Sequence, residues 1–181
     1  MKNIKILLAA LLVSGLSMTS CDNDEVLPPI VGSPTMLENG MEDFTMENVD
    51  VPEGVSDVWT WSDQYGAVAS GYIGGKRYAA DVYLVSPAVT LSTEPVCTFS
   101  QAINYLYSNN RADFINVCVR EIGGEWQEVE VDKWPAGSSW TFNDSSADLS
   151  AFANKTIQIG FHYQSTSAVQ PTWEVKSLRV Y

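Results

Sequence analysis

The stretch that decides the fold lies at the end of the sequence: Thr172-Trp173-Glu174-Val175-Lys176-Ser177-Leu178-Arg179-Val180-Tyr181. The apolar residues Trp173 and Val175 alternate with polar neighbours. After a slip of one residue, the alternation resumes at Leu178 and Val180. A period of two places successive side chains on opposite faces of a β-strand. The stretch therefore predicts a long closing strand with one face in a hydrophobic core.

Similar short patterns, separated by turn residues, recur upstream as far as Met41. They cover residues 58–61, 66–72, 82–85, 97–106, 114–121, 126–131 and 156–163. No segment has a sustained period of 3.6 residues, and only residues 147–153 fit one helical turn, capped by Asp148 or Ser150. Some nine strands joined by loops predict an all-β protein, an antiparallel β-sandwich. Periodicity alone does not choose between jelly-roll and immunoglobulin topology.

The order of several segments resembles a known family. The most specific segments are Leu84-Val85-Ser86-Pro87 with Leu91 four residues later, and Thr172-Trp173-Glu174-Val175. With Trp59, Trp126 and other weaker matches over residues 42–181, they resemble the choice-of-anchor J domain. That family is related to the cleaved-adhesin modules of gingipain-type proteins and to MAM domains. The resemblance implies a galactose-binding-like jelly roll on exported, surface-anchored proteins, without catalytic activity.

The first 21 residues have the organisation of an export signal. Residues 1–5 carry positive charge, residues 6–13 are apolar, and small residues lead to Cys21. The apolar run is far shorter than the roughly 20 residues of a membrane-spanning helix. We therefore exclude residues 1–20 from the fold. A cysteine directly after small residues resembles a bacterial lipobox, which implies cleavage before Cys21 and lipid on that residue.

Residues 21–40 are predicted to form a tether, because they are acidic, rich in Pro and Gly, and without periodicity. The sandwich then spans residues 41–181. An acidic stretch directly after Cys21 resembles the export signal of surface lipoproteins in Bacteroidota-type bacteria. This implies a lipid-anchored protein of the outer membrane, exposed at the cell surface. A solvated linker on a protein that faces the periplasm is the alternative.

The chain is strongly acidic, with 22 Asp and Glu against 10 Lys and Arg and a formal charge of −12. Residues 1–20 hold two lysines and no acid, so the exported part carries −14. Such a surface repels phosphate backbones and anionic lipids. The composition therefore argues against nucleic-acid binding and leaves the lipid anchor as the route to the membrane.

Two cysteines remain once Cys21 is lipidated. Cys97 shares a face with Phe99, which is predicted to be core, whereas Cys118 lies opposite its apolar neighbours. Unless a bulge intervenes, the two thiols face opposite sides of neighbouring strands, where disulfide geometry does not exist. We expect two free thiols.

The sequence offers little for catalysis. The single histidine, His162, stands in an alternating segment without a Gly-x-Ser-x-Gly elbow or a cysteine nucleophile motif. We expect it on the solvent face or at a sheet edge. His and Cys are too few and too scattered for a typical zinc site. A pair of carboxylates for glycoside hydrolysis stays formally open, but we expect no enzyme.

A structural calcium ion is a further implication of the resemblance, because such jelly rolls often link their first and last strands through a cation. The matching acids are Glu42 and Asp43 near the start and Glu174 in the closing strand. Carboxylate oxygens are ligands that Ca²⁺ prefers. The alternative is that these acids are solvated or hydrogen-bonded.

The aromatic residues divide into two groups. Those in alternating segments, expected in the core, are Trp59, Trp61, Trp126 and Trp173. Those in loop-like segments are Trp134, Tyr65, Tyr72 and Tyr78. Tyrosine and tryptophan on loops stack on sugar rings or anchor a protein partner. The second group therefore supplies the candidate ligand-binding residues, with packing under a loop as the alternative.

Together these features predict a non-catalytic lipoprotein whose sandwich binds carbohydrate or a cell-surface glycan, as an adhesin does. The alternative is a structural or assembly component that binds a surface protein and no small ligand. An exposed aromatic platform beside unpaired polar groups favours the first, and a broad flat apolar patch favours the second.

Overall fold

The structure is a computed structural model, and it describes residues 35–181. The predicted signal segment 1–20, the predicted lipidation site Cys21 and the tether up to residue 34 lie outside the described residues. Within residues 35–181, no helix has the length and apolar character needed to cross a membrane.

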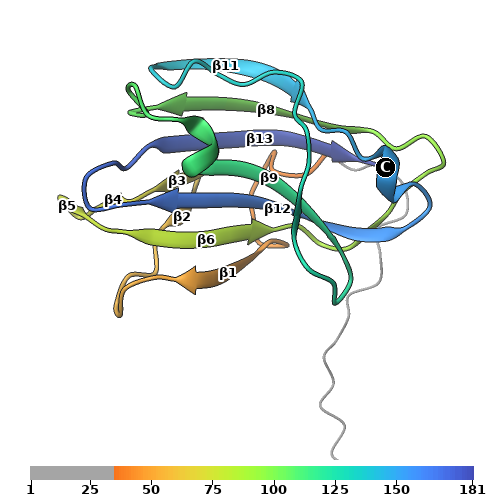
Figure 1. The fold of residues 1–181 in the computed structure, drawn as a ribbon, viewed down its shortest axis with the longest axis horizontal. Coiled ribbons are helices and arrows are strands. Elements are labelled where there is room, and N and C mark those ends of the chain that lie inside the picture. The colour runs from red at the N-terminus through yellow and green to blue at the C-terminus, as the bar shows by residue number, and fades with distance from the viewer. Residues whose placement is uncertain (1–34) are drawn as a thin grey trace, which may run out of the picture.

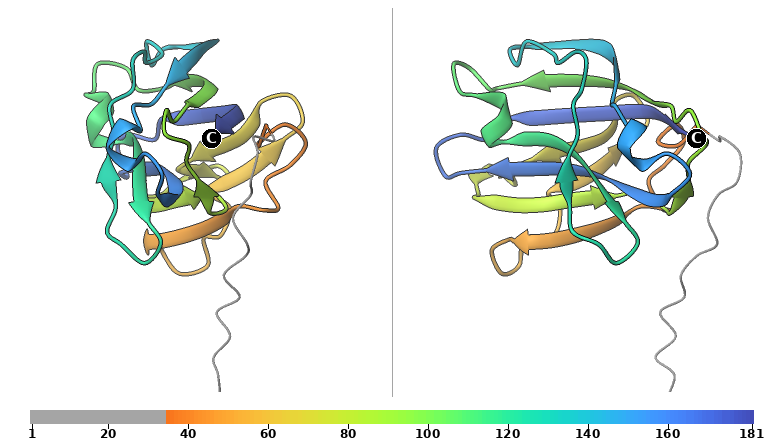
Figure 2. Two further views of the ribbon diagram at one scale, coloured as in Figure 1. Left: turned by 90° about the vertical axis from the view of Figure 1, so that its right-hand side faces the viewer. Right: turned by 45° about the vertical axis from the view of Figure 1, so that its right-hand side comes forward.

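The described chain forms two antiparallel sheets packed face to face (Figure 1 and Figure 2). One sheet has the order β1-β6-β12-β9-β10, with β7 beside β12, and the other has the order β11-β8-β13-β3-β2. β4 and β5 form a separate hairpin. The bounds are β1 Thr45–Asp50, β2 Trp59–Ser62, β3 Gly66–Ser70, β4 Tyr72–Ile73, β5 Lys76–Arg77, β6 Ala80–Val85, β7 Val89–Thr90, β8 Cys97–Asn104, β9 Ile115–Glu121, β10 Gln127–Glu128, β11 Ser139–Ser146, β12 Thr156–Ser165 and β13 Thr172–Val180. The predicted all-β antiparallel jelly-roll sandwich is confirmed.

The core lies between the inner faces of the two sheets, where the alternation of the sequence places apolar side chains. Phe161 of β12 and Trp173 of β13 are fully buried. Their ring centroids are 5.5 Å apart, and Phe99 of β8 lies at the same distance from Phe161. Each such edge-to-face pair adds about 0.5–1.5 kcal/mol beyond the burial of its area. Aromatic contacts thus join the sheets at their centre.

The slip predicted in the closing strand is a β-bulge. The register of β13 against β8 shifts between Lys176 and Arg179, and Ser177 has a φ of 55°. A bulge disrupts the ladder locally and leaves backbone groups without their regular partners.

The backbone groups of the bulge form hydrogen bonds with Met36 and Leu37, which precede the first strand. Met36 and Leu178 form an antiparallel bridge, and the N–H of Ser177 donates to the carbonyl of Leu37. The side chain of Leu37 is buried in the core. Residues 35–40 therefore pack on the sandwich instead of belonging to the tether. The sequence did not predict this because Leu37 is a single buried apolar residue, and one residue shows no periodicity.

The sequence patterns miss the exposed edges of the sheets. β1 and β11 are largely exposed edge strands, so they show no clear alternation of apolar residues. Residues 126–131 are the opposite case, since only Gln127–Glu128 pair as β10. The helical turn expected in residues 147–153 is a 3-10 turn at Ser150–Phe152, and Asp148 accepts a hydrogen bond from the N–H of Ser150.

Trp126, expected in the core, instead covers the outer face of the six-stranded sheet. It lies over Gly160, where a Cβ would be 2.8 Å from the indole ring. Tyr83 stacks on Trp126 with centroids 4.8 Å apart and on His162 with centroids 4.0 Å apart. The guanidinium of Arg120 lies 4.1 Å from the centroid of Trp126. We call these residues, His162, Tyr83, Trp126 and Arg120, the aromatic stack.

The two remaining cysteines are free, as predicted, and both are buried. Cys97 belongs to the core cluster between the sheets. Cys118 on β9 lies directly opposite Gly160 on β12, the glycine that Trp126 covers on the outer face of the sheet. Burial raises the pKa of each thiol to about 12. Both are therefore protonated and unreactive at neutral pH.

Candidate functional site

A cavity of about 260 Å³ lies at the end of the sandwich that carries the β4–β5 hairpin. The hairpin is at the left of Figure 1. The cavity is surrounded by the β4–β5 hairpin, the loop after β8 and the loop between β12 and β13. Its lining residues are Ser70, Tyr72, Arg77, Tyr105, Tyr107, Ala168, Gln170 and Thr172. We call it the tyrosine pocket.

The β4–β5 hairpin presents Tyr72 and Arg77 to the pocket as a cross-strand pair. Gly74 and Gly75 form the turn, with φ angles of 57° and 79°. A two-residue turn with both φ angles positive matches the right-handed twist of the strands, and glycine adopts it without strain. Because side chains alternate along a strand, Lys76 points away from the face that carries Arg77.

A buried hydroxyl ties this hairpin to the neighbouring loop. Tyr163 Oη accepts a hydrogen bond from the N–H of Gly71 and donates one to the carbonyl of Pro171, each at 2.7 Å. Burial raises the pKa of the Tyr163 phenol, so the donor proton is retained. Gly71 fits this close approach because a Cβ would lie 2.4 Å from Ser165 Oγ. One side chain thus positions two walls of the pocket.

The loop after β8 presents two tyrosines in an unusual backbone conformation. Tyr105 and Tyr107 have φ angles of 59° and 54°, in the left-handed region. That region costs on the order of 1–2 kcal/mol per residue outside glycine. Leu106 between them is buried, and its N–H donates to the carbonyl of Gly137 at 3.0 Å. The buried leucine therefore holds the strained loop in place.

The rings of this loop extend outward from the pocket. Tyr105 is 46% exposed and Tyr107 is 73% exposed. Trp140 at the start of β11 lies 5.5 Å from Tyr105 between centroids, at an interplanar angle of 81°. With Tyr72, these side chains gather four exposed aromatic rings at one end of the molecule.

Polar groups lie among the rings. Ser70 and Thr172 face each other across β3 and β13, and Gln170 lies two residues before Thr172 in the loop between β12 and β13. Arg77 is the one charged residue in the lining, which holds no acid although the chain has 22. Flat rings beside hydroxyl, amide and guanidinium groups can pack against the C–H face of a sugar and hydrogen-bond its hydroxyls.

The structure places the four predicted ligand-binding aromatics in different surroundings. Tyr72 lines the pocket. Tyr65 is exposed at the turn between β2 and β3, and Tyr78 is half-buried beside the hairpin, with its carbonyl accepting from Ser165. Neither is among the lining residues of the pocket.

Trp134 is a packing residue. Its ring lies 6.3 Å from the buried Trp173, and the guanidinium of Arg111 covers it at 3.9 Å from the centroid. The loop-like sequence around Trp134 therefore conceals a half-buried ring packed against the core cluster.

Tyr105, Tyr107 and Trp140 are the site residues that the sequence patterns miss. The pattern of residues 97–106 extends the predicted strand through Tyr105, although β8 ends at Asn104. The available signal is two tyrosines on either side of Leu106, directly before the turn-forming residues 108–110. Aromatic residues at a strand end beside a turn are candidates for a loop surface.

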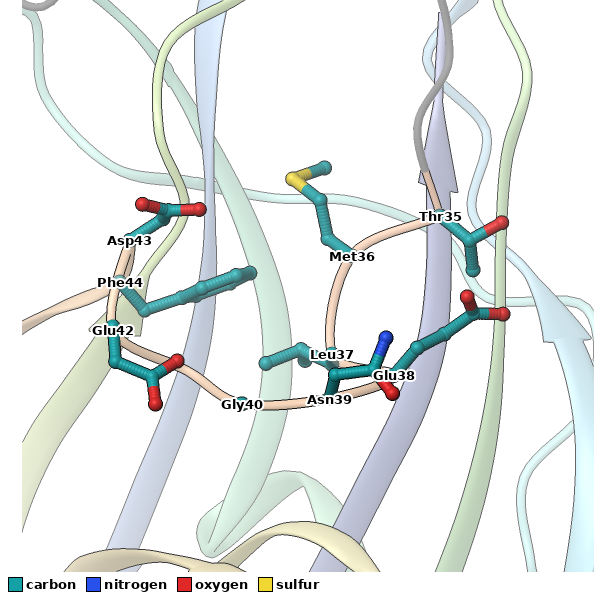
Figure 3. Close-up of a pocket in the computed structure, with 9 residues that line it drawn as sticks. All are labelled: Thr35, Met36, Leu37, Glu38, Asn39, Gly40, Glu42, Asp43 and Phe44. Atoms are coloured by element: carbon teal, nitrogen blue, oxygen red, sulfur yellow. The ribbon is translucent and has the colours of Figure 1, made fainter. Parts of the chain in front are cut away.

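The predicted calcium ligands are not brought together. Glu42 and Asp43 line a second cavity, of about 230 Å³, formed by residues 35–44 (Figure 3). Glu174 lies at the centre of the five-stranded sheet, between Val68 and Ala102. Within residues 35–181, no group of three or more His, Cys, Asp or Glu side chains is gathered as metal ligands.

Figure 3 also shows the carboxylates of Glu42 and Asp43 pointing in different directions around the loop. These residues do not fit a shared calcium site with Glu174. Calcium binding stays a prediction of the sequence, which melting of the protein in EDTA and in millimolar calcium would test.

His162 lies on the outer face of the six-stranded sheet, as expected, and is held by its neighbours. Its Nε2 lies 2.7 Å from Asp81 Oδ1, and Gln164 donates to Asp81 Oδ2 at 2.8 Å. Its ring stacks on Tyr83. These contacts give the imidazole a structural role in the sheet surface.

Comparisons with known proteins identify solved structures with a similar fold but do not assign this chain to a family. No family model matches the sequence, and no curated protein matches it. The K1 cleaved adhesin domain of Lys-gingipain from Porphyromonas gingivalis W83 aligns with a TM-score of 0.48 and 14% identity, over 82% of this chain and 96% of that chain.

Two carbohydrate-binding modules also align with the structure. The N-terminal cellulose-binding domain of Cellulomonas fimi β-1,4-glucanase C has a TM-score of 0.41 and 16% identity, covering 86% of this chain and 97% of its own. The xylan-binding module CBM15 has a TM-score of 0.37 and 15% identity, covering 76% and 95%. Likeness at this level concerns the fold and does not transfer a ligand. The resemblance to choice-of-anchor J domains stays a prediction.

Proposed function

We propose that the protein is a non-catalytic, exported lipoprotein that binds a glycan in the tyrosine pocket, in the manner of an adhesin. The observation that carries the proposal is the group of four exposed aromatic rings beside hydroxyl, amide and guanidinium groups. Exposed rings keep apolar surface in contact with water, which is unfavourable. A ligand that covers the rings removes this surface from water, and the free energy gained favours binding.

The backbone of the pocket supports binding by a preformed surface. Tyr105 and Tyr107 are held in left-handed conformations, and Tyr163 fixes the hairpin that carries Tyr72. Residues kept in sparsely populated conformations occur at binding sites, where the surrounding structure overdetermines them. A site that is already ordered loses less conformational entropy when a ligand binds.

The position of the pocket supports an anchored role. β13 begins at Thr172 in the pocket lining and reaches the bridge between Met36 and Leu178 six residues later, about 20 Å away. A lipid at Cys21 would hold the end of the sandwich near Met36 toward the membrane. The pocket would then face away from the membrane, whether the protein is anchored at the cell surface or faces the periplasm.

A protein-docking scaffold is less well supported. That function calls for a broad apolar surface, whereas the exposed large hydrophobic residues outside the pocket region are spread over the described chain. They are Met46, Val49, Tyr65, Ile122 and Tyr181. Scattered exposed apolar residues are normal for a soluble surface.

A glycan array with the purified protein tests the proposal. We expect binding that Tyr107→Ala abolishes and Tyr65→Ala leaves unchanged, because both tyrosines are exposed but only Tyr107 lines the pocket. Loss of binding in both variants would place the site elsewhere. An array without hits, from protein shown to be folded, would turn the interpretation to the scaffold and to cross-linking on intact cells.

A further inference from the structure

We propose that the tyrosine pocket selects a glycan with a single carboxylate-bearing sugar residue, and that Arg77 binds that carboxylate. This inference rests on the proposed function and names the ligand class. The starting observation is the contrast between one cation in the lining and an acidic chain of formal charge −12.

Arg77 differs from the other arginines of the described chain in having no side-chain partner. Arg120 pairs with Glu47 at 2.9 Å and covers Trp126. Arg111 donates to the carbonyl of Ile115 and to Asn116, and covers Trp134. Arg179 donates to Thr35 at 3.0 Å. Within residues 35–181, the Arg77 side chain makes no hydrogen bond, salt bridge or ring contact of this kind.

The geometry around Arg77 suits an anion attached to a ring. A guanidinium presents its donors in a planar fork that matches the two oxygens of a carboxylate. Tyr72, directly across the hairpin, places an aromatic ring on the same face. Thr172 and Gln170 on the opposite wall offer a hydroxyl and an amide for the remaining sugar hydroxyls. Carboxylate, ring face and hydroxyls are the three features of an acidic sugar.

The charge of the protein limits how many acidic groups the ligand carries. Screening confines interactions between exposed charges to roughly 8 Å at physiological ionic strength. One carboxylate at Arg77 benefits from the local cation. A polyanion would extend its further charges over a strongly acidic surface and be repelled. The inferred ligand is therefore an otherwise neutral glycan with one uronic or sialic acid residue.

The test compares acidic glycans with neutral partners of the same backbone. The probes are sialyllactose against lactose, a glucuronic-acid-substituted xylo-oligosaccharide against the unsubstituted oligosaccharide, and heparin as a polyanion. The variants are Arg77→Gln and, as a matched control, Lys76→Gln, which removes the same charge from the opposite face of the hairpin. Both residues are exposed, so both variants are expected to fold.

We expect one acidic glycan to bind at least about fivefold more tightly than its neutral partner, and heparin to bind no better than the neutral glycans. Arg77→Gln should remove the preference for the acidic glycan over its neutral partner, and Lys76→Gln should retain that preference. The pair that shows the preference distinguishes sialic from uronic acid.

Equal binding of acidic and neutral glycans, with Tyr107→Ala still abolishing it, would overturn this inference and leave the proposed function standing. A preference that survives Arg77→Gln, or stronger binding of heparin, would also overturn it. Absence of binding to every glycan on the array and in solution, with folded protein, would overturn both proposals.

Discussion

Two aromatic clusters on this protein look alike in composition and differ in what their rings touch. In the aromatic stack, Tyr83 packs on Trp126 and His162, while Arg120 covers Trp126 and pairs with Glu47. Every ring there has a partner within the protein. In the tyrosine pocket, Tyr72 and Tyr107 are 58% and 73% exposed. Arg77 is also exposed, and its side chain has no hydrogen-bond or salt-bridge partner among residues 35–181. The two clusters therefore differ in the exposure of their side chains more than in their aromatic content.

The largest expected effect separates the two clusters by stability. Trp126→Ala removes a ring that covers Gly160 and leaves Arg120 without its aromatic partner. We expect the free energy of unfolding to fall by about 3 kcal/mol, at the lower end for loss of a buried tryptophan because this one is half-buried. Denaturant unfolding measures the loss, and titration calorimetry should show unchanged glycan affinity. A loss of affinity with unchanged stability would reverse the roles assigned to the clusters.

The second prediction addresses Tyr107 in the pocket. Its removal should weaken glycan affinity by at least about thirtyfold, or about 2 kcal/mol, which abolishes the signal on an array, as for an anchor residue at the centre of a binding site. Because Tyr107 has a φ of 54°, Tyr107→Gly should be more stable than Tyr107→Ala by about 1 kcal/mol. Thermal unfolding compares the two variants, which are equal in the loss of the ring. Equal stabilities would show that the left-handed backbone is not strained.

A smaller effect is expected for the hydroxyl that supports the pocket. Tyr163→Phe leaves the N–H of Gly71 without its acceptor in a buried position. We expect a loss of about 1.5 kcal/mol of stability, together with weaker glycan binding because the hairpin with Tyr72 and Arg77 is no longer fixed. The equivalent change in the stack, Tyr83→Phe, keeps the stacked ring and should leave binding unchanged. Weakened binding in both variants would show that the two clusters are coupled.

The last effect concerns pH and involves Glu174 on β13, the central strand of the five-stranded sheet. Glu174 is 4% exposed, and its Oε2 has no hydrogen-bond partner among residues 35–181. Burial raises its pKa from 4.5 to about 7, against the opposing influence of Lys176. The folded state therefore holds the proton more tightly than the unfolded state. This contribution to stability is complete below pH 4.5 and is lost as pH rises through 7.

Glu174→Gln should remove that dependence. We expect the variant to melt a few degrees above the wild type at pH 8 and close to it at pH 4.5. Thermal melts across this range measure the difference. Parallel curves for the two proteins would mean that Glu174 is ionised in the folded state at all these pH values.

The fold was predictable from the sequence wherever burial of one strand face produces an alternation of apolar and polar residues. Trp173 and Val175 in the closing strand show the alternation of a half-buried strand, and the slip after them marks the bulge at Ser177. The edge strands β1 and β11 escape this signal because most of their side chains are exposed on both faces. β11, which carries Trp140, is one of these strands.

The site was less predictable than the fold because it depends on contacts between distant segments. Tyr72 was identified from its loop-like surroundings, whereas Trp134 has similar surroundings and packs under Arg111. Local sequence does not distinguish the two, since the difference is which side of the ring the rest of the chain covers. Tyr105 and Tyr107 belong to the pocket because Leu106 is drawn into the core, and that burial is a tertiary event.

The pairing of residues 36 and 37 with the bulge of β13 has a mechanical consequence. A glycan held at Thr172 and a chain held before Thr35 would pull the sandwich from opposite ends, along the direction of its strands. Backbone hydrogen bonds between antiparallel strands lie perpendicular to that direction, so those joining Met36 to Leu178 and Leu37 to Ser177 would bear the load together in shear. The hydrogen bonds between residues 36–37 and β13 would thus carry tension between a lipid anchor at Cys21 and a bound ligand.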